Sequence, residues 1–221
     1  MTEEFFYHYT TKEAATGIFL SGKILPSLGS KGDAAHGDGV YLTTLEPRLG
    51  IDTVKNNNWA GLAGNGDKKV EAYYEIFLPS SKVIRAKDKR DIQVHSGALN
   101  LSDYKWSLKN WEGELLATEH FMISSQGEAA IIQHQAMGRY TLARNIVMYD
   151  GIPVYKHDEA EYYLFRNKTG NWVVSIIAGH NHYNLSQNNG DFSPSPLKTL
   201  PWRYSAPVWK EDVTLRVYPC Y

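Results

Sequence analysis

The chain has 221 residues, with 23 Lys and Arg against 24 Asp and Glu and a formal net charge of −1. Both halves are nearly neutral, since residues 1–108 hold 13 basic and 13 acidic side chains and residues 109–221 hold 10 and 11. This balance does not predict the electrostatic attraction on which binding to nucleic acids or anionic membranes depends. The length suits one large domain or two small ones, and the many Tyr and Gly residues favour β-structure.

Cysteine use and the N-terminal sequence bear on the compartment. The single cysteine, Cys220, cannot form a disulfide within the chain, which favours a reducing environment. The first residues lack the basic start and apolar core of a signal peptide, and no apolar run reaches the length of a membrane-spanning helix. We therefore expect a cytoplasmic protein with no membrane partner. The sequons at Asn100, Asn167 and Asn184 are interpreted as chance matches.

The first predicted element is a strand over residues 5–10, Phe-Phe-Tyr-His-Tyr-Thr. The spacing from Thr10 to Glu13 is typical of a capping box, and the apolar residues of 12–21 form one stripe before a glycine, so a helix is predicted there. His8 then lies near the carboxyl end of the strand. A helix N-terminus at that point has free N–H groups that favour an anion such as pyrophosphate.

Residues 37–44, Gly-Asp-Gly-Val-Tyr-Leu-Thr-Thr, predict a tight turn that enters a short strand centred on Tyr41. The segment 56–67 is rich in Asn and Gly and is predicted to be a loop over a site or a lid.

Residues 70–78 alternate between an apolar face and a mixed face that carries Glu71 and Glu75, which is typical of a central strand. A short strand over 83–86 and a solvated charged turn over 87–91 are predicted to follow.

The order of these motifs resembles a known family. The chain resembles the ADP-ribosyltransferase domains with a His-Tyr-Asp motif. These are relatives of the poly-ADP-ribosylating transferases. The resemblance rests, in order, on His8-Tyr-Thr, a helix, Ser21-Gly-Lys-Ile-Leu-Pro-Ser, a glycine-rich gap and Gly37-Asp-Gly-Val-Tyr-Leu-Thr-Thr-Leu-Glu-Pro. The likeness continues through residues 71–80 and, more weakly, through 97–102, so it covers about residues 5 to 103.

The resemblance implies an α+β domain with a split β-sheet and NAD as substrate. It implies that His8 binds the ribose on the nicotinamide side and that Tyr41 stacks on the nicotinamide ring, with Tyr9, Thr10 and Gly39 lining the same pocket. A strand histidine and a strand tyrosine are commonly packing residues. Their occurrence together, in this order and within these motifs, favours a binding site.

The third catalytic position of the family is acidic, but this chain has Asn100 there, and the nearest carboxylate is Asp103. A neutral amide cannot supply the negative charge that a positively charged ribose needs. Glu75 and Glu71, on the mixed face of the predicted strand, are chemical substitutes, and Glu128 is a remote one. Of these we predict Glu75 as the catalytic acid in preference to Asp103, because a strand holds its side chain in place.

The second half of the chain has a different sequence pattern, with repeated short predicted strands. Residues 108–130 are predicted to join an N-terminal domain of residues 1–107 to a β-rich module of residues 131–221, with a possible helix at 112–119. In the module, Asp150-Gly151 predicts a hairpin turn of type I′.

Further elements are predicted along the same module. They are a strand pair across residues 167–170, a long loop over 179–207 and a closing strand over 213–218.

This module resembles a β-rich module of invertebrate multidomain proteins. The resemblance rests on Gly138-Arg-Tyr, Gly151-Ile-Pro-Val-Tyr, Gly170-Asn-Trp-Val-Val-Ser and Trp209-Lys-Glu-Asp-Val-Thr-Leu. It implies a sandwich-like fold and no particular activity. Most of its aromatic side chains are expected to fill the core, although a stacking surface for sugar or protein ligands is an alternative.

Three functions remain open from the sequence. The first is an ADP-ribosyltransferase that uses NAD, with the β module binding a protein or nucleic-acid acceptor. The second is a degenerate domain that binds NAD, ADP-ribose or a protein without turnover, and the third is an interaction protein in which His8 and Tyr41 are structural. His180 and His182 have metal-like spacing, but no third ligand is nearby in the sequence, and no metal is predicted.

Overall fold

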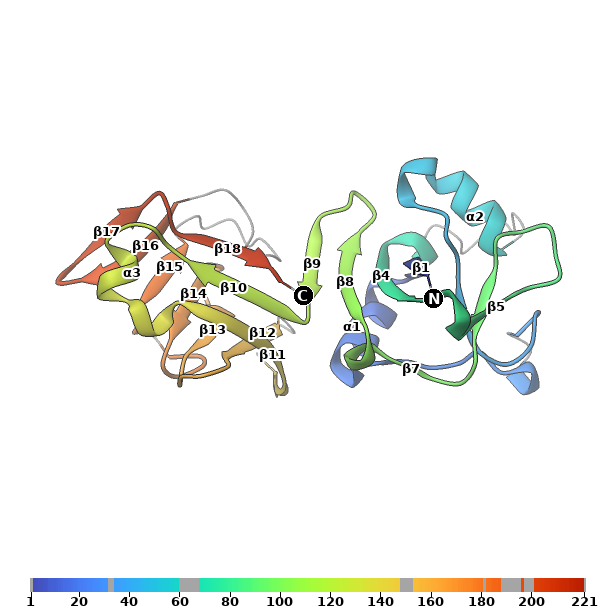
Figure 1. The fold of residues 1–221 in the computed structure, drawn as a ribbon, viewed down its shortest axis with the longest axis horizontal. Helices are drawn as coiled ribbons and strands as arrows, with labels where there is room; N and C mark the ends of the chain where they lie inside the picture. The colour runs from blue at the N-terminus through green and yellow to red at the C-terminus, as the bar shows by residue number, and fades with distance from the viewer. Residues whose placement is uncertain are drawn as a thin grey trace. The chain divides into compact units, whose positions relative to one another are not determined.

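The computed structural model describes residues 2–31, 34–59, 68–147, 153–180, 182–187, 196 and 201–220. The fold is rich in β-sheet, with few helices (Figure 1). The chain divides into two compact units, residues 1–116 and 117–221. Among the described residues, no helix is long and apolar enough to cross a membrane.

The N-terminal unit is built from three sheets. Their strand orders are β1-β4-β8-β9, β3-β6-β5 and β2-β7. The strands are β1 (Glu3–Thr10), β2 (Lys23–Ile24), β3 (Val40–Leu42), β4 (Ala72–Pro79), β5 (Val83–Arg85), β6 (Gln93–His95), β7 (Leu99–Asn100), β8 (Lys105–Asn110) and β9 (Leu115–Thr118). The predicted strands around residues 5–10, 70–78 and 83–86 are thus confirmed, and Val70 belongs to a short helical turn before β4.

Helix α1 (Lys12–Ser21) occupies the predicted residues and ends at Gly22, which has a left-handed conformation with a φ of 68°. The predicted capping box at Thr10 was wrong by one residue. The N-cap is Thr11, whose hydroxyl accepts a hydrogen bond from the Ala14 N–H at 3.1 Å. The buried side chains of the helix, Ala15 and Phe19, place it against the sheet.

Helix α2 (Ile51–Trp59) replaces the first part of the loop predicted over residues 56–67, and residues 60–67 lie outside the described residues. Its sequence has weak helix propensity because of three consecutive Asn residues. Tertiary contacts support it instead: Val54 is fully buried, and the Asn57 amide donates to the Asp91 carbonyl at 2.9 Å. Single 3₁₀ turns complete the unit: η1 (Gly29–Lys31), η2 (Pro47–Leu49), η3 (Lys68–Val70), η4 (Ser80–Lys82) and η5 (Leu101–Asp103).

The central strand β4 separates two faces of the sheet. Ala72, Tyr74, Ile76 and Leu78 are completely buried, and the Tyr74 hydroxyl donates to the Ala15 carbonyl of α1 at 2.8 Å. The alternate residues face the other side, where a second buried cluster packs partly buried side chains around it. That cluster contains Tyr7, Tyr9, Val54, Val70 and Tyr73, with Leu45, Trp59 and Trp111 packed against it.

Two of the sheets meet between β1 and β3. The backbones of Tyr7 and Thr43 exchange two hydrogen bonds, of 2.8 and 3.1 Å, and this bridge is isolated from the ladders on either side. Beyond it β3 pairs with β6 and β1 pairs with β4. The β1 and β3 strands are therefore neighbours that part from one another within a few residues.

The C-terminal unit contains one curled sheet of nine strands in the order β17-β16-β15-β14-β13-β12-β11-β10-β18 (Figure 1). The predicted β-rich character of this module is confirmed, and its described strands form one curled sheet where a sandwich-like fold was expected. The strands are β10 (His120–Ser124), β11 (Gly138–Val147), β12 (Pro153–His157), β13 (Tyr163–Arg166), β14 (Trp172–Ser175), β15 (Leu185–Gln187), β16 (Trp202–Ala206), β17 (Val208–Asp212) and β18 (Arg216–Pro219). The turns α3 (Ala129–Ile132) and η6 (His134–Ala136) connect β10 to β11.

Aromatic side chains fill much of the interior of this unit, as expected. Six are almost completely inaccessible: Phe121, Tyr140, Tyr155, Phe165, Trp172 and Tyr204. Such large rings each bury a large apolar area and pack here with aliphatic side chains such as Val154, Leu164 and Val173.

Two predictions for the chain after residue 107 were wrong. Residues 112–119 contain strand β9 and not a helix, because Gly113, with a φ of 83°, turns the chain back after β8. The segment 179–207, predicted as a loop, contains β15 and β16.

The antiparallel pairing of β11 with β12 agrees with the predicted hairpin, but its turn at Asp150-Gly151 lies outside the described residues. The pair β13 and β14 across residues 167–170 is confirmed. The closing strand is confirmed for its later part, since β18 starts at Arg216.

Gly39 allows a close approach of β6 to the turn before β3. A Cβ atom at this position would lie 2.5 Å from Val94 Cγ1 and 2.6 Å from the His95 carbonyl oxygen. We expect Gly39→Ala to destabilise the N-terminal unit by about 1–3 kcal/mol, as overpacking against backbone does. The measurement is the free energy of unfolding in urea. Gly17→Ala is the control, since its Cβ would meet nothing within 4 Å and a helical Ala should stabilise slightly.

Candidate functional site

His8 lies where β1 and β3 part. Its Nδ1–H donates to the Tyr41 carbonyl of β3 at 3.0 Å, which fixes the ring and leaves Nε2 as an acceptor in the neutral tautomer. Burial lowers the pKa of His8 below its usual value, although the Tyr41 carbonyl opposes this shift, so the ring is neutral at pH 7. Among the described residues, Nε2 has no hydrogen-bond partner. The site thus presents the His8 Nε2 atom as an oriented hydrogen-bond acceptor at the point where β1 and β3 separate.

Tyr41 is fixed through its hydroxyl group. The oxygen accepts from the His36 N–H at 2.7 Å and donates to the Gly37 carbonyl at 2.9 Å. The His36 ring in turn is hydrogen-bonded at Nε2 by the Arg90 guanidinium at 2.8 Å, and Arg90 Nε donates to Asp88 at 2.7 Å. This chain of contacts orients the partly buried Tyr41 ring before any ligand arrives.

Asp91 holds the end of β3 in place. One carboxylate oxygen accepts from both hydroxyls of Thr43 and Thr44 at 2.8 Å and from the Thr44 N–H at 2.5 Å, and the other accepts from Gln93 at 3.0 Å. Burial opposes ionisation, but these hydrogen bonds outweigh it and hold the pKa of Asp91 below its usual range. The predicted solvated turn over residues 87–91 was therefore wrong for Asp91, which is an internal anchor.

Three predicted pocket residues have structural roles. Tyr9 is almost fully buried in the aromatic cluster, and its hydroxyl donates to the Leu45 carbonyl at 2.8 Å. Thr10 is buried opposite Ala72 and does not cap the helix. The backbone of Gly39 exchanges hydrogen bonds of 2.9 and 3.1 Å with Ser27. Their sequence positions beside His8 and Tyr41 are explained by packing.

The N-terminus of α1 does not offer the anion site that was predicted. The Lys12 N–H donates to the Glu71 carboxylate at 3.0 Å, and the Ala14 N–H donates to Thr11. A side chain of the same unit thus already supplies the negative charge that this helix end favours. Glu71, considered as a substitute acid, has this capping contact instead.

Glu75 and His8 are not brought together. The register pairs Glu75 with Tyr7 and pairs His8 with Tyr74, so strand alternation puts the two side chains on opposite faces of the sheet. Glu75 accepts from the Lys109 ammonium at 2.6 Å and from the Ser107 hydroxyl at 3.2 Å. Its side chain is 19% exposed, so the carboxylate belongs to a partly buried ion pair on the face of the aromatic cluster.

Asn100, at the third position of the motif, lies in the short strand β7, which pairs with β2. Asn100 pairs with Lys23 in the β2–β7 ladder, and its amide donates to the Asp103 carboxylate at 3.4 Å. Glu128 lies in the C-terminal unit, where it accepts from the Tyr204 hydroxyl and the Lys210 ammonium. Neither the hydrogen bond between Asn100 and Asp103 nor the hydrogen bonds of Glu128 involve His8 or Tyr41.

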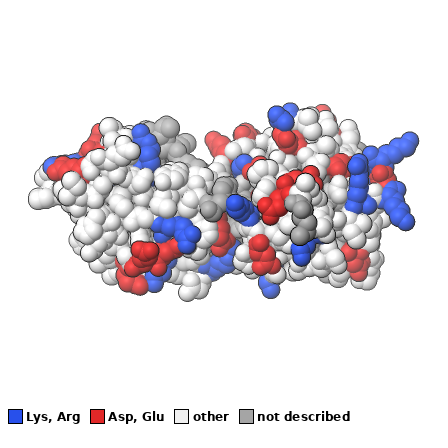
Figure 2. Space-filling model, viewed as in Figure 1, with Lys and Arg blue, Asp and Glu red and all other residues white. Residues whose placement is uncertain are grey.

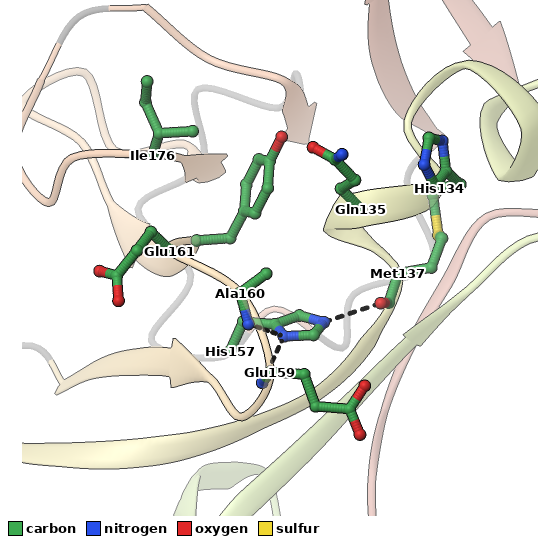
Figure 3. A pocket seen from close by; sticks show the side chains of 9 residues that line it. His134, Gln135, Met137, His157, Glu159, Ala160, Glu161 and Ile176 are labelled. Atoms are coloured by element: carbon green, nitrogen blue, oxygen red, sulfur yellow. Dashed lines mark hydrogen bonds between the residues drawn. The ribbon is translucent and has the colours of Figure 1, made fainter.

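A surface pocket of about 680 Å³ lies in the C-terminal unit (Figure 3). Its central His157 donates from Nε2 to the Met137 carbonyl at 2.8 Å, and its Nδ1 accepts from the N–H groups of Glu159 and Ala160 at 3.0 Å. Figure 3 shows the Glu159 and Glu161 carboxylates pointing away from this ring. Both ring nitrogens are satisfied internally, so His157 shapes the turn and has no free atom for chemistry.

The rings of His180 and His182 lie 5.1 Å apart. Within the described residues, no group of three or more His, Cys, Asp or Glu side chains is placed to hold a metal ion.

His36, Arg90 and Asp91 position the site but were not predicted from the sequence. The only signals were a histidine just before the Gly37-Asp-Gly turn and a charged segment assigned to solvent. The Thr43–Asp91 and His36–Arg90 contacts join residues 48 and 54 positions apart in the sequence, so local patterns could not reveal them.

No family model, no curated protein and no solved structure matches this chain.

Proposed function

We propose that the N-terminal unit binds NAD where β1 and β3 part and transfers ADP-ribose to a macromolecular acceptor. The observation that carries the proposal is the ring of His8, fixed through Nδ1 by the Tyr41 carbonyl and left with Nε2 as an acceptor. A neutral, oriented imidazole is suited to accept a hydrogen bond from a ribose hydroxyl. The motif resemblance around His8 and Tyr41 supports the choice of NAD.

In this proposal Tyr41 supplies a face for the nicotinamide ring, and the contacts with His36 and Gly37 hold it ready. Bound NAD supplies an ADP-ribosyl group through its bond between nicotinamide and ribose, and positive charge develops on the ribose as that bond breaks. The hydrogen bond to His8 orients the ribose. Arg90 brings a positive charge near Tyr41, because it contacts the ring of His36, whose backbone N–H donates to the Tyr41 hydroxyl.

The acceptor is proposed to be a protein or a nucleic acid, selected by the C-terminal β unit. On the face drawn in Figure 2, the C-terminal unit shows a few acidic and basic side chains among many uncharged ones. Such a surface favours recognition by shape and local contacts over attraction by net charge.

A second function, binding of NAD or ADP-ribose without turnover, is favoured by the carboxylates. Glu75 is in an ion pair on the face opposite His8, and Asn100 occupies the third motif position. A carboxylate near the ribose is worth several kcal/mol to a positively charged transition state. Without one, NAD would bind and be cleaved slowly.

Tyr41→Ala should weaken NAD binding by about 1–3 kcal/mol, the value of a lost aromatic stack. Isothermal calorimetry on the full chain measures this change. Tyr104→Phe is the control, since within the described residues no hydrogen bond or ring contact joins Tyr104 to Tyr41. Unchanged affinity in a folded Tyr41→Ala protein would remove Tyr41 from the site.

Nicotinamide release from NAD separates the two functions. Asp103→Asn should lower turnover at least about tenfold if the loop carboxylate reaches the ribose. Glu75→Gln should leave turnover unchanged, because its ion pair with Lys109 lies on the other face of the sheet. Loss of turnover in Glu75→Gln alone would return the catalytic role to the strand, and absence of release from the parent protein would favour binding without turnover.

A further inference from the structure

A second pocket, of about 340 Å³, lies in the N-terminal unit on the sheet face opposite His8. Tyr7 of β1 and Tyr73 of β4 line it, together with Trp111 from the turn after β8. Three carboxylates also line it, from Glu46, Glu75 and Glu112, and so does the guanidinium of Arg48. The proposed use of NAD does not involve this pocket.

The Tyr73 hydroxyl is a polar group for which the fold gives no partner. The residue is only 4% exposed, and no hydrogen bond to its hydroxyl is found within the part of the chain that the structure describes. The hydroxyl is directed at the pocket edge, where a Cβ atom on Gly113 would lie 3.8 Å away. The hydroxyl therefore lines the pocket without a hydrogen bond to the described part of the fold, and a ligand in the pocket can pair with it.

The electrostatics of the pocket are negative. Burial raises the pKa of Tyr73 to about 12, and the charge of Glu75 adds to the shift. Burial also raises the pKa of Tyr7, and the charges of Glu75 and Glu46 add to it. The carboxylates therefore act on both hydroxyls that line the pocket.

The ion pairs around the pocket leave it acidic. Glu75 is paired with Lys109, and Glu46 is paired with the exposed Arg48 at 2.5 Å. No ion pair of Glu112 is found in the described part of the chain. An exposed pair such as Glu46 with Arg48 is worth only about 0–1 kcal/mol, so a ligand can replace Arg48 as the partner of Glu46.

We propose that this pocket binds an organic cation that bears a guanidinium or ammonium group. An anion would meet three carboxylates against the single guanidinium of Arg48, whereas a cation gains the carboxylate charge, an acceptor in the Tyr73 hydroxyl and the ring of Trp111. A guanidinium group suits these partners best because it is planar, stacks on aromatic rings and donates to several carboxylates. The ligand is either a small free amine or a basic side chain of a peptide.

The test compares N-acetyl-arginine amide with N-acetyl-citrulline amide, its neutral isostere, by calorimetry on the full chain without NAD. We expect the arginine compound to bind at least about tenfold more tightly, since the charge is the only difference of consequence. Agmatine and a glycine-flanked arginine peptide then identify the source of the cation, and a preference for either supports the proposal.

Two variants locate the binding. Tyr73→Phe removes one oxygen and should weaken binding about two- to tenfold, the value of one hydrogen bond. Glu112→Gln, at an exposed position, should also weaken it, while Glu4→Gln on the exposed start of β1 should not. Thermal unfolding of each variant shows that the fold is intact.

Equal binding of the citrulline compound would overturn the proposal. So would the absence of saturable binding of the arginine compound up to about 10 mM, a concentration that corresponds to a free energy near −3 kcal/mol. Because NAD is absent throughout, such a result leaves the proposed NAD site untouched. Likewise, failure of NAD to bind leaves this pocket unaffected.

Discussion

Replacing Asp212 by Ala is expected to destabilise the C-terminal unit by about 3 kcal/mol, since a buried hydrogen-bonded carboxylate is lost. Asp212 is only 6% exposed. One oxygen accepts from the Ser125 hydroxyl at 2.8 Å and the Ala129 N–H at 3.1 Å, and the other accepts from the Thr214 N–H at 2.8 Å and its hydroxyl at 2.6 Å. The variant leaves these donors without their acceptor.

The same carboxylate predicts a pH dependence. Burial opposes ionisation of Asp212, but hydrogen bonds from Thr214 and Ser125 outweigh it and hold the pKa at about 2. An unfolded Asp has a pKa of about 3.9, so its contribution of about 2.6 kcal/mol is complete above about pH 5 and is lost as the pH falls towards 2 and below. The difference in stability between the parent protein and the Ala variant should shrink over this range.

Urea unfolding followed by tryptophan fluorescence at several pH values measures both effects. Glu211→Ala is the control, because its exposed pair with Arg203, at 2.9 Å, should change stability by less than about 0.5 kcal/mol. A loss for Asp212→Ala no larger than for Glu211→Ala would show that the Asp212 contacts do not hold β17 to the start of α3.

Replacing His8 by Ala is expected to weaken NAD binding by about 1–3 kcal/mol, or roughly five- to 150-fold, because a buried hydrogen-bond partner is removed. Nicotinamide release should fall with it. Burial keeps the pKa of His8 below its usual value of about 6.5. Affinity should therefore be constant from pH 8 to about pH 6.5 and decrease as the pH falls through the lowered pKa, where the protonated ring loses its acceptor.

His8→Gln distinguishes hydrogen bonding from packing. Its amide oxygen can still accept a hydrogen bond but does not titrate, so partial affinity without the acidic decrease is expected. His134→Ala, in the C-terminal unit, serves as the matched control. An acidic decrease that persists in His8→Gln would assign the titration to another group.

Local patterns predicted the elements that carry their own signal. The apolar stripe and the glycine after it specified α1, and the alternation of residues 70–78 specified β4. Strand β16 has the same kind of signal, since Trp202, Tyr204 and Ala206 are buried and the residues between them are less so. It was overlooked because the surrounding segment is rich in Asn, Ser and Pro.

Other features depend on contacts that the sequence does not display. Helix α2 forms despite its Asn residues because Val54 and Asn57 meet distant partners. Strand β9 overrides the helix propensity of Glu, Leu and Ala through pairing in a sheet.

The candidate site was predictable in part. The resemblance implied one pocket for His8 and Tyr41, and in the structure the His8 ring donates to the Tyr41 carbonyl. The face on which Glu75 lies depends on a register of one residue between β1 and β4, which composition does not set. The groups that fix Tyr41 come from residues 36–37 and 88–90, and only the folded chain brings them together.

The most direct test of the central claim is a titration of the full chain with NAD, followed by backbone amide NMR spectra. The account predicts saturation with one NAD per chain and shifts that are largest for amides around His8, Gly39 and Tyr41. In His8→Ala the same shifts should require a higher NAD concentration. Absence of saturable shifts, or shifts centred on Tyr73 and Trp111 on the other face of the sheet, would contradict it.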